Sequence, residues 1–120
     1  MTNQDSQNTR LAFVDICVFD DGSVRGGAIV TDIASRPYEF RVTSPIKPSD
    51  LQKILYGNSL VEYMYGELIS LPLLKQLKES VSLAICRDEH ILIARPNLQF
   101  PLVYLKKSQK QTAEIIIQTH

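Results

Sequence analysis

The sequence has no excess of charge of either sign, because 13 Lys and Arg residues balance 13 Asp and Glu residues. It therefore lacks the basic character of a protein that binds nucleic acid through bulk charge. It also has no apolar run near the roughly 20 residues that a membrane-spanning helix needs. Its first residues, MTNQDSQNTR, are polar where a signal peptide would be apolar. These absences predict a soluble cytoplasmic protein with no membrane association.

Cysteine and histidine are scarce as well, with two residues of each. Cys17 and Cys86 lie in separate apolar runs and form no CxxC pair, so we expect reduced thiols packed in the core. A zinc site is disfavoured, because His90 is the only histidine inside the chain and His120 ends it. The glycine-rich phosphate loops, the serine-hydrolase elbow and the zincin HExxH motif are also missing, so no cofactor is expected from motifs.

What the sequence does contain is enough length and apolar content for one domain, with 120 residues of which 44% are hydrophobic. Residues 1–10 have too little apolar surface to offset their ordering entropy, which predicts a disordered N-terminal tail before a single α+β domain over residues 11–120. Strands are predicted over residues 11–19, 23–33 and 38–44, joined as an antiparallel meander. The first is continuously apolar, which favours a central strand covered on both faces, and an Asp-Asp-Gly turn follows it.

A helical region is predicted over residues 51–79, with Ser49 or Asp50 as its N-cap. The Gly-Asn-Ser segment at 57–59 and Pro72 are expected to divide it into shorter helices. At a helical spacing of about 100° per residue, Glu67 falls within the stripe expected to pack on the sheet. The apolar members of that stripe are Leu60, Met64, Leu68 and Leu71.

Strand character returns after Ser80, first in VSLAIC and then, after the tight connection RDEH, in ILIA. Further strands are predicted over residues 100–105 and 113–119, the last being either an edge strand or a strand added to another subunit. The fold class is therefore α+β: an antiparallel three-strand meander, a helical layer, and further strands in one mixed sheet.

Acidic residues occupy positions where burial is expected. Asp15 interrupts the first strand and Glu67 interrupts the apolar helix stripe, so we expect both carboxylates to be substantially desolvated. Asp88 follows the apolar run that ends at Cys86. If the elements meet at one edge of the sheet, the three carboxylates could hold a divalent cation. The structural alternative is pairing with a cation, for which the candidates are Arg25, Arg41 and Arg87.

Over about residues 11–90 the chain resembles the ribonuclease H-like superfamily. The segment FVDICVFDDGSVRGGAIVTD is similar to the first hairpin of that family, GELISLPLLKQL to its helix, and SLAICRDE to its fourth strand. The resemblance implies that Asp15, Glu67 and Asp88 are metal-binding and catalytic, and that they hold Mg²⁺ or Mn²⁺ for phosphodiester hydrolysis. Asp21 in DDGS is a rival first acid. The family continues with helices and a late fourth acid, whereas the only acid here after Glu89 is Glu114.

Two functions from different classes follow. The preferred one is a small noncatalytic binding or scaffolding domain that self-associates as a homodimer, through the β-prone EIIIQT tail or through a face bearing Tyr56, Tyr63 and Tyr65. A different protein partner is also compatible with it. The alternative is the metal-dependent nuclease, and only this reading predicts a nucleic-acid partner. The basic segment Lys106, Lys107 and Lys110 is a solvated connector in the first case and a phosphate contact in the second.

Overall fold

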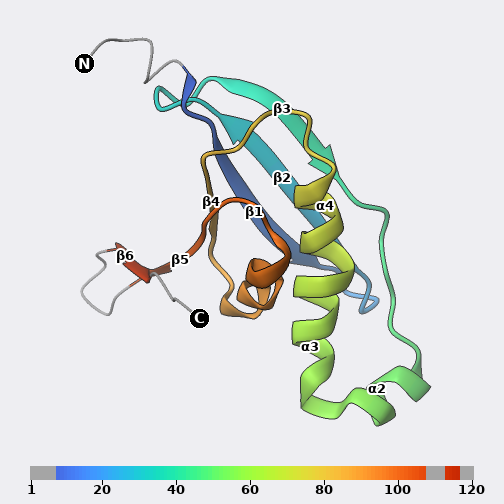
Figure 1. Ribbon diagram of the computed structural model, residues 1–120. Coiled ribbons are helices and arrows are strands. Elements are labelled where there is room, and N and C mark those ends of the chain that lie inside the picture. The colour runs from blue at the N-terminus through green and yellow to red at the C-terminus, as the bar shows by residue number, and fades with distance from the viewer. Residues whose placement is uncertain (1–7, 108–112, 117–120) are drawn as a thin grey trace.

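The computed structural model describes residues 8–107 and 113–116, which form a six-stranded mixed sheet with a helical layer on one face (Figure 1). Along the sheet the strands have the order β3-β2-β1-β4-β5-β6. Their bounds are β1 (Leu11–Val18), β2 (Val24–Thr31), β3 (Pro37–Val42), β4 (Leu83–Cys86), β5 (Leu102–Lys107) and β6 (Ala113–Ile116). In the part of the chain that is described, no helix is long and apolar enough to cross a membrane.

Strand directions confirm the predicted α+β class. β1, β2 and β3 form an antiparallel meander, β4 runs parallel to β1, β5 runs parallel to β4, and β6 returns antiparallel to β5. β6 therefore pairs within its own chain, as the edge-strand prediction requires. The predicted residues 117–119 of that strand, and residues 1–7 of the predicted tail, lie outside the described residues.

The connection from β3 to β4 is a chain of short helical segments: α2 (Asp50–Tyr56), the 3-10 turn η1 (Gly57–Ser59), α3 (Leu60–Glu62), the π-helical η2 (Tyr63–Ser70) and α4 (Leu71–Lys75). Ser49 caps α2, because its Oγ accepts a hydrogen bond from the Gln52 amide at 3.1 Å. Gly57, at a φ of 55°, ends α2, and Pro72 lies in the first turn of α4. The predicted cap and the predicted break at 57–59 are thus confirmed, whereas the backbone stays helical across Pro72, where only the hydrogen-bond pattern changes from π to α.

The π-helical turn changes which residues face the sheet. After Leu60 and Met64, the next large side chain to be fully buried is Ile69, five positions after Met64. A spacing of five matches the i→i+5 hydrogen bonds of a π-helix, whereas the prediction assumed a regular α-helix. Glu67 is turned to the surface and is exposed, so the prediction that it is desolvated was wrong.

The segment predicted as the strand ILIA is also different. Residues Glu89–Asn97 form the 3-10 helix η3, which packs beside η2 on the helical side of the sheet. Its buried residues are Ile91 and Ala94, three positions apart, which is the period of a 3-10 helix. The strand prediction was wrong because a four-residue apolar run does not distinguish a strand from a buried helical turn.

The core lies between the helical layer and one face of the sheet. Strand side chains contribute Ala12, Val14, Ala28, Val30, Ala84, Cys86 and Leu102, and the helices contribute Leu73, Leu74 and Ile91. Two glycines allow close approach, one between the sheet and the helical layer and one between the helices η2 and η3. A Cβ on Gly26 of β2 would overlap the Cγ2 atom of Ile69, and a Cβ on Gly66 of η2 would overlap the Cγ2 atom of Ile93.

We predict that Gly26→Ala lowers the free energy of unfolding by about 1–3 kcal/mol, because the added methyl group overpacks the interface with Ile69. Gly27→Ala is the matched control, since the nearest atoms to its Cβ would lie at 3.7 Å, an ordinary contact distance. Urea denaturation of the two variants measures the difference. Equal stability of the two would contradict this packing.

Glu39 ties the edge strand β3 to the segment that follows α4. Its carboxylate accepts hydrogen bonds from the backbone N–H groups of Lys78 at 2.9 Å and Glu79 at 3.0 Å, and it pairs with Arg41. Burial acts to raise the pKa of Glu39, but the bonds from Arg41 and the two amides outweigh it. The pKa of Glu39 therefore lies below its usual value of 4.5.

Replacing this carboxylate, as in Glu39→Gln, should cost about 1–3 kcal/mol of stability at neutral pH. Because the folded-state pKa is depressed, the contribution is complete above pH 4.5 and is lost as the pH falls through the folded-state pKa. Urea denaturation should therefore show the gap between wild type and variant closing in acid. Glu89→Gln removes an exposed carboxylate and should change stability little at either pH. A gap that stays constant in acid would argue against this role for Glu39.

Candidate functional site on the open face of the sheet

The two faces of β1 carry different side chains. Ala12 and Val14 point into the core, so Phe13, Asp15 and Cys17 lie on the opposite face, which we call the open face. Within the described residues no helix covers this face, and Phe13 and Cys17 are exposed there. The prediction that the first strand is covered on both faces was therefore wrong for the described part, although β1 is central as predicted.

The edge strand β3 reverses the usual arrangement of polar and apolar residues. The charged Glu39 and Arg41 are half-buried and form an ion pair, whereas the apolar Phe40 is 68% exposed. Val42 is exposed on the same side as Phe40. The alternation in this segment did indicate a half-exposed strand, but it could not show that the apolar half is the exposed one.

The open face forms a shallow cavity of about 630 Å³. Its walls are mainly apolar, with Phe13, Ile29, Phe40, Val42, Ile85 and Leu105 among them. Three charged residues, Asp15, Arg25 and Arg87, also line it. A concave apolar surface with a few polar groups is the usual character of a binding site.

Asp15 lies at the centre of this face and is paired with Arg87. The parallel register of β1 and β4 places Phe13 opposite Ile85. Asp15 and Arg87 each follow two residues later, so they come together, and the Arg87 guanidinium donates a hydrogen bond to the Asp15 carboxylate. The Asp15 side chain is 48% exposed, so the prediction that it is substantially desolvated was wrong. The hydrogen bond and the negative charge of Asp15 raise the pKa of Arg87. The structural alternative for Asp15 holds, with Arg87 as the partner.

The two cysteines lie on opposite faces. Cys86 of β4 is buried in the core as predicted, and burial raises the pKa of its thiol to about 11. Cys17, predicted to be packed, is instead exposed on the open face, and its cross-strand neighbour is Arg25. The Nε of Arg25 is buried and has no hydrogen-bond partner among the described residues.

Asp88 does follow β4, as predicted, but it is engaged with its own chain. Its Oδ1 accepts a hydrogen bond from the His90 amide at 3.0 Å and lies 2.7 Å from His90 Nδ1, so Asp88 caps η3. The ring of Tyr65 meets His90 edge-on, with the centroids 6.1 Å apart. The rival acid Asp21 is held in the hairpin turn, where it accepts hydrogen bonds from Ser23. Those bonds lower the pKa of Asp21.

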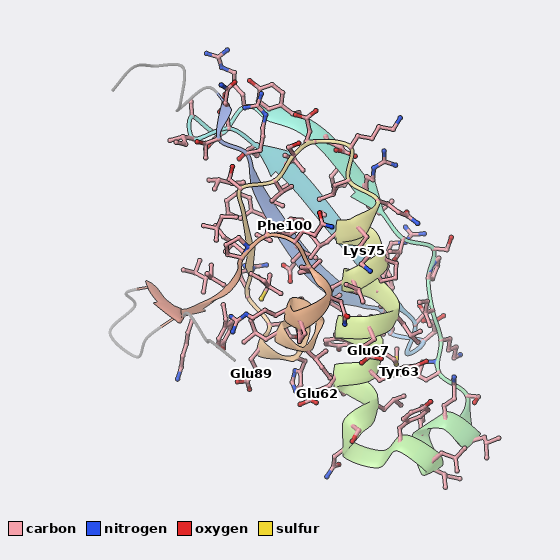
Figure 2. All side chains as sticks on the ribbon, viewed as in Figure 1. Glu62, Tyr63, Glu67, Lys75, Glu89 and Phe100 are labelled. Carbon is pink, nitrogen blue, oxygen red and sulfur yellow. The ribbon has the colours of Figure 1, made fainter. Side chains whose placement is uncertain are left out.

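Glu67 belongs to η2 in the helical layer, in front of the sheet in Figure 2, whereas Asp15 lies on the face away from the helices. Among the described residues, no group of three or more His, Cys, Asp and Glu side chains is placed to hold a metal ion. As it stands, the arrangement therefore does not fit a cation shared by Asp15, Glu67 and Asp88.

The tyrosines and lysines proposed from the sequence lie in different environments. Tyr56 and Tyr63 stack with their ring centroids 4.9 Å apart, and the neighbouring Tyr56 raises the pKa of Tyr63. Tyr65 instead packs half-buried against the core, where burial raises its pKa. Lys106 is exposed on β5, while the side chain of Lys107 and all of Lys110 lie outside the described residues.

No protein-family model matches the chain, and no curated protein is significantly similar to it in sequence. A solved structure does share its fold. Human ENDOV superimposes with a TM-score of 0.61 at 13% identity, over 86% of this chain and 47% of that protein. A Ciona intestinalis endonuclease V, bound to a 23mer DNA containing an inosine, gives a TM-score of 0.49 at 8% identity, over 83% of this chain and 46% of that one. The chain thus spans about half the length of these proteins. Its fold is of ribonuclease H-like type, in agreement with the resemblance in the sequence.

Proposed function

We propose that the chain is a noncatalytic binding domain that self-associates through the open face of its sheet. The observation that carries this proposal is the reversed pattern of β3, where Phe40 and Val42 are exposed while Glu39 and Arg41 are half-buried. Large apolar side chains gathered on one face commonly mark an interaction surface. Phe13, on β1, extends the same surface toward the centre of the sheet.

The polar groups of the open face are compatible with contact rather than with catalysis. Asp15 is already bound by Arg87, so neither charge stands alone on the apolar surface. Aromatic side chains and arginine are enriched in protein interfaces, and here Phe13 and Phe40 lie on the same face as Arg25 and Arg87. Net charge also favours self-association, because a chain with no net charge does not repel its own copies.

This function predicts that wild-type protein shows concentration-dependent self-association in sedimentation velocity. Phe40→Glu should weaken it by at least about 30-fold, because it places an unpaired carboxylate within the contact. Ile33→Glu is the control: it alters an equally apolar, exposed residue in the turn between β2 and β3, outside the cavity. A wild-type chain that stays strictly monomeric over a wide concentration range would remove the proposal.

A second candidate function is metal-dependent cleavage of nucleic-acid phosphodiesters by Asp15, Glu67 and Asp88. It is favoured by the fold shared with human ENDOV and by the position of Asp15 on β1, beside the β4 strand that Asp88 follows. For this function Asp15 would have to exchange Arg87 for a cation, and Glu67 would have to approach from the other layer. It therefore needs a rearrangement, whereas the binding function uses the surface as it stands.

Calorimetric titration with Mn²⁺, together with a cleavage assay, distinguishes the two functions. The binding domain predicts equal, negligible heats for wild type and Asp15→Asn, and no cleavage of DNA, RNA or hybrid substrates. The nuclease predicts a heat in wild type that Asp15→Asn abolishes, together with metal-dependent cleavage. Asp50→Asn is the control for nonspecific binding by an exposed carboxylate. A specific heat with cleavage would overturn the noncatalytic assignment.

A further inference from the structure

β3 is an edge strand whose outer side is open. It stands first in the strand order β3-β2-β1-β4-β5-β6, and in Figure 1 it forms the upper right border of the sheet. Among the described residues no strand pairs with its outer side. Every second residue of an edge strand directs its backbone N–H and C=O groups away from the sheet, where they can pair with another chain. The direction of these groups along β3 therefore decides what the edge can bind.

The ladder between β2 and β3 shows which residues face outward. The Thr43 N–H donates to the Gly26 carbonyl oxygen at 2.9 Å, and the Gly26 N–H donates to the Thr43 Oγ1, also at 2.9 Å. The backbones of these two residues thus point toward each other. Inward and outward residues alternate along an antiparallel ladder, so the N–H and C=O groups of Phe40 and Val42 point away from β2. The free edge therefore presents two successive pairs of donor and acceptor groups.

This edge lacks the features that usually protect an edge strand, which are lysine, proline or a bulge within the strand. Residues 39–42 include no lysine and no proline, and the register irregularity of the β2–β3 ladder lies before them, between Val30 and Thr31. The two residues that direct their backbone outward also expose apolar side chains, Phe40 by 68% and Val42 by 53%. A strand added here would gain backbone hydrogen bonds and apolar contacts together.

The helical layer leaves room beside this edge. A cavity of about 510 Å³ lies between residues 40–44 and α4, where it is lined by Pro72, Leu73 and the C-cap residue Gln76. On the other side of the sheet, no helix of the described residues covers the open face. Side chains of an added strand can therefore be accommodated on both faces of the sheet.

The residues of β3 complement a second copy of themselves. When two β3 strands pair antiparallel about a two-fold axis at Phe40, the two Phe40 residues face each other, and their outward backbone groups can exchange both hydrogen bonds. Glu39 of each copy then lies opposite Arg41 of the other, so no like charges meet. These two residues are already paired within each chain, so the contact requires no new ion pair. An axis at Arg41 would instead place two arginines opposite each other.

From these observations we infer that two copies of the chain pair through the free edges of β3, antiparallel and centred on Phe40, and form one continuous sheet. This inference rests on the self-association proposed above and names the part of the surface at which it occurs. The two-fold axis of such a pair is perpendicular to the sheet, so the two open faces lie on the same side and join edge to edge. Phe40 of each copy is then covered by Phe40 of the other.

The test compares two substitutions at one position. Val42→Pro removes an outward N–H group that the ladder with β2 does not use, so the fold should be retained, which thermal unfolding checks. Val42→Ala is the matched control, because it shortens the same side chain but keeps the N–H group. In sedimentation velocity we expect wild type to dimerise and Val42→Pro to associate at least about 30-fold more weakly. Val42→Ala should lose less than about fivefold.

Amide hydrogen exchange of the wild type measures the same contact without a substitution. As the protein concentration rises into the range of the dimer, the N–H groups of Phe40 and Val42 should exchange at least about tenfold more slowly, whereas the amides of α2 should not change. Should Val42→Pro fail to fold, this measurement decides alone.

The outcomes separate the inference from the proposed function. If wild type dimerises, but both Val42 variants associate equally and the two amides gain no protection, the open faces pack against each other. The inference is then overturned while the proposed function stands. A wild-type chain that stays monomeric overturns both.

Discussion

The alternation of side chains along β1 is the constraint on which the rest of the structure depends. Once Ala12 and Val14 face the core, Phe13 and Asp15 must face the other way, because successive residues of a strand point to opposite faces. A slip of one residue would place Asp15 among the core side chains, where an unpaired carboxylate costs several kcal/mol. The apolar core thus determines, indirectly, that the only acid of β1 lies on the open face.

Strand pairing extends this arrangement of side chains across the sheet. The antiparallel register with β2 places Ile29 opposite Phe13, and the register of β2 with β3 places Phe40 opposite Ile29. On the other side, the parallel register with β4 places Ile85 opposite Phe13. The apolar open face is therefore a row of register partners that spans four strands, rather than a chance collection of exposed side chains.

The sequence could predict what depends on neighbouring residues. The meander, the Ser49 cap and the break at Gly57 were all predicted, since alternation, capping and turn chemistry act over a few positions. It could not predict which side of β3 faces the helices, because alternation has the same period in either orientation. The burial of Glu39 depends on amides 39 and 40 positions away, which no local pattern contains.

The candidate site shows the same limit. Asp15, Glu67 and Asp88 were each correctly placed on a strand, a helix and a strand end, but their faces were not predictable. Glu67 was expected to face the sheet because a regular helix was assumed, and one π-helical turn is enough to move it to the surface. The pairing of Asp15 with Arg87 joins residues 72 positions apart and exists only through the β1–β4 register.

That ion pair also determines what the open face can accept. The Asp15 side chain is about half exposed and the Arg87 side chain is mostly exposed. The ion pair therefore contributes little to the stability of the isolated chain. Covering a lone carboxylate with apolar side chains would be strongly unfavourable, whereas a carboxylate already bound to a guanidinium loses less on burial. Arg87 therefore makes the centre of the face compatible with a covering layer.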